Sequence, residues 1–93
     1  MDWSRSYRLA PGCAMRREGF GGILYHYEGV RPDPRVYFLD SPFLVALLEL
    51  TGEASLEELI AQARATFALT AQQEQSVRAF FTALIERGAL VVQ

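Results

Sequence analysis

Cysteine and histidine each occur once in the 93-residue sequence, as Cys13 and His26. If the two residues faced each other on neighbouring strands, the thiol could act as a nucleophile and the imidazole as its base. A buried thiol and an imidazole at the surface of a sheet are the simpler interpretation. One cysteine cannot form an internal disulfide, and we find neither a metal-ligand pattern nor a glycine-rich phosphate loop. The sequence therefore predicts a protein that is not an enzyme and that carries no cofactor and no metal.

The charge balance argues against nucleic acid as a partner. Nine Lys and Arg residues stand against eleven Asp and Glu residues, for a net charge of -2. A nucleic-acid-binding domain needs clustered cations that displace counterions from phosphates. The longest apolar run, residues 43–48, is far shorter than the roughly 20 residues of a membrane span. We expect a cytoplasmic protein that binds neither nucleic acid nor a membrane.

The composition changes once, near Asp40, and this change predicts the fold class. Glycine, proline and aromatic residues precede it, and leucine, alanine and glutamate at helical spacing follow it. A run of strands followed by a run of helices is typical of α+β domains. We expect a single domain over residues 1–93. Its predicted parts are an N-terminal arm (1–10), a three-stranded antiparallel sheet (13–39), a three-helix part (41–87) and an apolar tail (89–93).

Local signals mark the ends of the predicted helices. Ser41 can cap the first helix, with Pro42 at its first position. Ser55 and Thr70 each open a capping box before an apolar stripe. Gly88 is suited to the left-handed exit of the last helix. The glycines at positions 19, 21 and 22 predict a turn between strands, and residues 29–34, with two prolines, predict a loop.

The third predicted strand, residues 36–39, is the most informative element. In a three-stranded meander it lies at an edge, where one row of backbone N–H and C=O groups has no partner. Natural edges usually carry a charge or a proline, and this strand carries neither. An extended peptide could add to it as a further strand. The N-terminal arm or a second copy of the chain could equally cover it.

An aromatic stripe follows in the last predicted helix, at Val77, Phe80, Phe81 and Leu84. Most of such a stripe belongs to the core, but part of it can line a groove beside the third strand. Arg78 flanks the stripe and could meet an acidic peptide, although a solvated surface charge is the simpler interpretation. The candidate peptide-binding residues are Val36, Tyr37, Phe38, Leu39, Val77, Arg78, Phe81 and Leu84.

Residues 17–27, which read REGFGGILYHY, and residues 36–39, which read VYFL, resemble the mycofactocin-system peptide chaperones. That family lies within the PqqD-like class of precursor-peptide recognition domains. The resemblance implies a winged-helix-like fold and a chaperone that presents a ribosomally made precursor peptide to a radical SAM maturase. It also implies that the peptide lies as an added strand along the third strand, in a cleft shared with the third helix. The iron–sulfur cluster and SAM would belong to the maturase.

Two other functions are compatible with the pattern. A small winged-helix DNA-binding or regulatory domain would need a basic helix, and residues 70–87 hold only two arginines. A dimerisation module would use the third strand on a second copy, as a homodimer formed by strand exchange.

Overall fold

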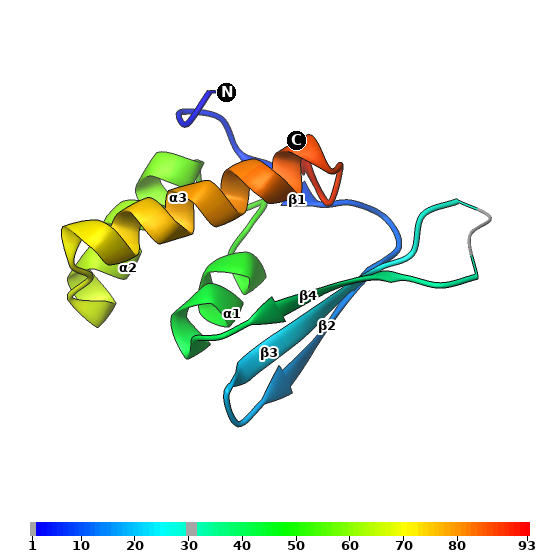
Figure 1. Cartoon of the computed structure of the whole chain (residues 1–93). Coiled ribbons are helices and arrows are strands. Elements are labelled where there is room, and N and C mark those ends of the chain that lie inside the picture. The colour runs from blue at the N-terminus through cyan, green and yellow to red at the C-terminus, as the bar shows by residue number, and fades with distance from the viewer. Residues whose placement is uncertain (1, 30–31) are drawn as a thin grey trace.

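The computed structural model describes residues 2–29 and 32–93. Residue 1 of the predicted arm and residues 30–31 of the predicted loop therefore lie outside the described residues. In chain order the elements are β1 (Tyr7–Leu9), β2 (Cys13–Glu18), β3 (Gly21–His26), β4 (Arg35–Leu39), α1 (Pro42–Glu49), α2 (Leu56–Phe67), α3 (Ala71–Glu86) and β5 (Leu90–Val92). The structure confirms the predicted α+β class, with an antiparallel sheet followed by three helices (Figure 1).

The three-stranded sheet has the order β2-β3-β4, and every neighbouring pair is antiparallel. A tight turn at Gly19 and Phe20 joins β2 to β3. The next residue, Gly21, has φ +147°, and a Cβ atom there would lie 2.1 Å from the backbone oxygen of Leu39. Glycine is therefore required where the start of β3 meets the end of β4.

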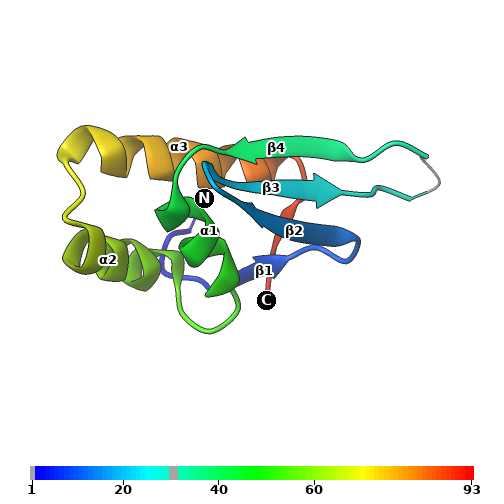
Figure 2. The same ribbon diagram turned by 90° about the horizontal axis from the view of Figure 1, so that it is seen from below.

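Helix α1 packs on one face of this sheet and contacts α2, and α3 runs on the same side of the sheet, alongside β4 (Figures 1 and 2). Both predicted capping boxes are present, at Ser55 with Glu58 and at Thr70 with Gln73. Ser41 occupies the predicted cap position of α1, but its side chain makes no capping hydrogen bond. Its backbone carbonyl instead accepts a hydrogen bond from the N–H of Leu44.

The arm and the tail pair with each other. Strand β1 forms a two-stranded antiparallel sheet with β5, in which Tyr7 lies opposite Val92 and Leu9 opposite Leu90. The arm is thus held at the C-terminal end of α3 and does not reach β4 (Figure 2). The sequence left the arm and a second copy of the chain as possible partners for the edge of the third strand. The described part of the arm does not take this role, because it pairs with β5.

The core lies between the inner face of the sheet and the three helices. Its largest fully buried side chains are Phe81, Leu24, Leu39, Leu47, Leu48, Leu56, Leu59, Ile60, Leu84, Leu90, Val45 and Val77. Over the described ranges, none of the helices combines the length and the apolar character needed to cross a membrane.

Candidate functional site

The sheet has two edge strands, and they differ in how well their edges are protected. Strand β2 carries Arg16, Arg17 and Glu18 in succession. Arg16 pairs with Glu18, and Arg17 reaches across to Glu49 of α1 at 2.6 Å. Charges of this kind discourage the addition of another strand. Strand β4 carries no charge after its first residue, so it is the more open of the two edges.

Side chains alternate along β4 between the core and solvent. Tyr37 and Leu39 point inward and are 8% and 0% exposed. Val36 and Phe38 point outward and are 44% and 68% exposed. Within the part of the chain that the structure describes, only β3 pairs with β4. The strand is therefore firmly held on its inner face and open along its outer edge.

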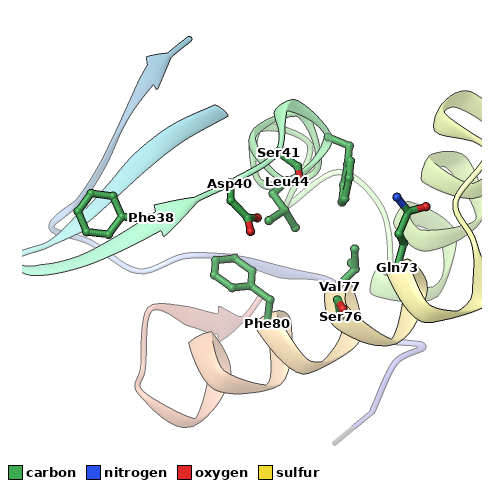
Figure 3. A pocket seen from close by; sticks show the side chains of 9 residues that line it. Phe38, Asp40, Ser41, Leu44, Gln73, Ser76, Val77 and Phe80 are labelled. Atoms are coloured by element: carbon green, nitrogen blue, oxygen red, sulfur yellow. The ribbon is translucent and has the colours of Figure 1, made fainter. Parts of the chain in front are cut away.

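A groove of about 390 Å³ lies between the end of β4, the start of α1 and the exposed side of α3 (Figure 3). We call it the β4–α3 groove. Its lining is Phe38, Asp40, Ser41, Phe43, Leu44, Gln73, Ser76, Val77 and Phe80. Three phenyl rings and two aliphatic side chains form most of the wall, and Asp40 supplies the one formal charge among these nine residues. The groove can accept an apolar side chain that has polar groups close by.

Helix α3 contributes its residues through a single face. Gln73, Ser76, Val77 and Phe80 lie at spacings of three, one and three, which places them one above another along the helix. Sequence reasoning identified Val77 as a candidate and placed Phe80 in the stripe that could partly line a groove, but it named neither Gln73 nor Ser76. Their spacing was a usable signal, but it did not reveal which side of α3 would face β4.

The remaining candidates on α3 lie away from the groove. Phe81 and Leu84 are 0% exposed and belong to the core. Arg78 pairs with Glu57 at 3.2 Å and with Glu74 at 3.4 Å. Its guanidinium also lies 4.9 Å from the ring centre of Trp3. These contacts hold Arg78 on the α2 side of α3, so it is not one of the groove's charges.

The structure places Cys13 directly opposite His26 on the inner face of β2 and β3. The thiol donates a hydrogen bond to the carbonyl of Ala89 at 3.7 Å, and burial raises the pKa of Cys13. A raised pKa disfavours the thiolate that a nucleophilic cysteine needs. The imidazole is buried, and its Nδ1 lies 3.5 Å from Glu28 without a hydrogen-bond partner among the described residues. The pair is adjacent, but its surroundings are those of a structural thiol.

Comparison with known proteins gives one match. Residues 6–91 match the model of the peptide chaperone MftB family. The matched segment runs from the residue before β1 into β5 and includes β4, α1 and α3, the elements that form the groove. No curated protein and no solved structure matches the chain.

Proposed function

This chain belongs to the peptide chaperone MftB family, and on that basis we propose that it binds a ribosomally made precursor peptide and presents it to a radical SAM maturase. In this proposal the peptide adds as a strand to the free edge of β4 and places one side chain in the β4–α3 groove. The process served is mycofactocin biosynthesis in the cytoplasm, as the sequence resemblance implies. The chaperone itself performs no chemistry, and the iron–sulfur cluster and SAM belong to the maturase.

The observation that carries the proposal is a strand edge that is apolar from Val36 to Leu39 and lies beside a groove of side-chain size. Backbone hydrogen bonds along β4 would hold any extended peptide, whatever its sequence. The groove would add selectivity, because only a peptide with an apolar residue at the right position could fill it. Tyr37 and Leu39, anchored in the core, keep the strand rigid before the peptide arrives. A pre-ordered edge lowers the entropic cost of binding.

The test is to obstruct the groove without disturbing the fold. Ser76 lines the groove and is solvent-exposed, so Ser76→Trp should fill the space while α3 remains intact. The probe is a synthetic peptide matching a short gene beside the chaperone gene and a radical SAM gene, with Val-Tyr at its C-terminus. We expect the Kd from isothermal calorimetry to rise at least roughly tenfold, as for loss of one buried anchor side chain.

Gln75→Trp is the matched control, because Gln75 is an exposed neighbour that does not line the groove. It should leave the Kd close to that of the unmodified chain. If Ser76→Trp bound the peptide as tightly as Gln75→Trp, the groove would have no part in binding. Analytical ultracentrifugation of the free protein tests the homodimer alternative. A stable dimer that excludes the peptide would favour pairing of β4 with a second copy of the chain.

A further inference from the structure

Two charged side chains beside β4 stand out because they have no ionic partner. The described arginines that pair with a carboxylate are Arg16, Arg17, Arg35, Arg64 and Arg78. Arg87, just after α3, instead lies over the ring of Tyr37, 5.8 Å from its centre. Among the described residues no carboxylate is within ion-pair distance of Arg87. The positive charge of Arg87 is therefore not neutralised by a described carboxylate, and Arg87 is itself exposed near the middle of β4.

Asp40 is the second such group. It follows the last residue of β4, is exposed, and is not ion-paired to any described residue. Figure 3 shows its carboxylate directed into the groove, on the side of Val77 and Phe80. A ligand in the groove would bring its own polar groups close to this carboxylate.

The two charges lie toward opposite ends of the same edge. Asp40 is three residues beyond Tyr37, which corresponds to about 10 Å of extended strand. Helix α3 runs in the opposite direction to β4, so its C-terminal end lies beside the middle and start of the strand (Figures 1 and 2). The edge is therefore negative near α1 and positive near the C-terminal end of α3. Arg35, at the first position of β4, adds no net charge to this end, because it pairs with Glu28 at 3.4 Å.

We infer that this edge selects peptides by the order of their charges. The preferred segment is extended and apolar, with a Lys or Arg residue followed about three or four residues later by an Asp, a Glu or a terminal carboxylate. This inference rests on the proposed function, because it requires the peptide to lie along β4. The order follows from an antiparallel strand, which begins beside Asp40 and ends beside Arg87 and which pairs slightly better than a parallel one.

The physical basis is a difference in charge complementarity between the two orders. A peptide with the preferred order places each charge beside its opposite, whereas the reversed order places like charges together. Apolar and hydrogen-bonding contacts would be equal for the two. Both protein charges are exposed, so salt should weaken the preference.

The test selects a phage-displayed library of random dodecapeptides on the full-length protein and on a double variant, Asp40→Arg with Arg87→Glu. The unmodified protein should enrich apolar segments in which a cation precedes an acid. The double variant should enrich the opposite order. Peptides selected on the unmodified protein should bind the double variant roughly tenfold more weakly, as expected for two exposed attractions turned into repulsions.

The control variant, Arg8→Glu with Glu53→Arg, also reverses one charge of each sign and keeps the net charge, and neither of its residues lines the groove. It should enrich the same order as the unmodified protein. The inference would be overturned if the enriched peptides competed at the groove but showed no order of charges. It would also be overturned if the double variant enriched the same order as the unmodified protein. Either result would leave the proposed function standing. A library that yields no peptide blocked by Ser76→Trp would overturn both.

Discussion

Truncation of Phe38 separates peptide binding from folding. Phe38 is the last outward-facing residue of β4 and is 68% exposed. An aromatic side chain has roughly 150–250 Å² to bury, so on the order of 100–170 Å² remains for a ligand to cover. If a bound peptide covers half of this area, Phe38→Ala loses about 1–2 kcal/mol of binding free energy at about 25 cal/mol per Å². The Kd should rise roughly five- to thirtyfold.

The loss in the free energy of unfolding should be a small part of the roughly 5–15 kcal/mol that is typical of native domains, so the variant should still fold. About a third of the surface of Phe38 packs against the protein. The buried area therefore limits the loss in the free energy of unfolding to less than about 2 kcal/mol. Circular dichroism with urea would measure this loss, and calorimetry with the synthetic precursor peptide would measure the Kd.

Phe20→Ala is the matched control for Phe38→Ala. Phe20 is 50% exposed and lies in the turn between β2 and β3, where it does not line the groove. The Phe20→Ala variant should lose about as much free energy of unfolding as Phe38→Ala and should keep the peptide affinity of the unmodified chain. Equal affinity losses in the two variants would refute the assignment of the binding edge to β4.

Three further outcomes concern the scaffold. Gly21→Ala should lower the free energy of unfolding by about 2–4 kcal/mol, because its Cβ would collide with backbone at positive φ, whereas Gly19→Ala should stay within about 0.5 kcal/mol in urea titrations. Burial raises the pKa of Cys13, so its contribution to stability is complete below the ordinary thiol pKa of about 8.5 and is lost as pH rises through the raised value. The urea midpoint of the unmodified protein should therefore fall as the pH is raised into the alkaline range, and that of Cys13→Ala should fall less. The hydrogen bond from Arg64 lowers the pKa of Glu74, so its contribution is lost as pH falls below the ordinary Glu range, and Glu74→Gln should flatten that acid-side decline in thermal melts.

Short-range signals in the sequence were sufficient for the three-stranded sheet, the three helices and their order. Pro42, Ser55 and Thr70 each act on backbone within a few residues, through a missing N–H or a capping hydrogen bond. These effects depend on immediate neighbours, so they can be read without knowing the rest of the chain.

The candidate site was only partly predictable. Val36 and Phe38 are exposed where an edge-bound peptide could reach them, and Val77 lines the groove although it is almost fully buried. Phe81 and Leu84 turned out to be core, because the apolar arc of α3 is wider than the groove. Whether any of these residues contacts a peptide stays a prediction.

By itself, the sequence determined three strands, three helices, an uncharged third strand and the family resemblance. Only the tertiary structure decided that β1 pairs with β5 and not with β4, and that carboxylates hold Arg78 on the α2 side of α3. It also decided that Asp40 in the groove and Arg87 over Tyr37 have no ionic partner among the described residues. Each of these facts depends on which distant segments pack together. Such packing is set by the shape of the whole core and leaves no signal in any single stretch of residues.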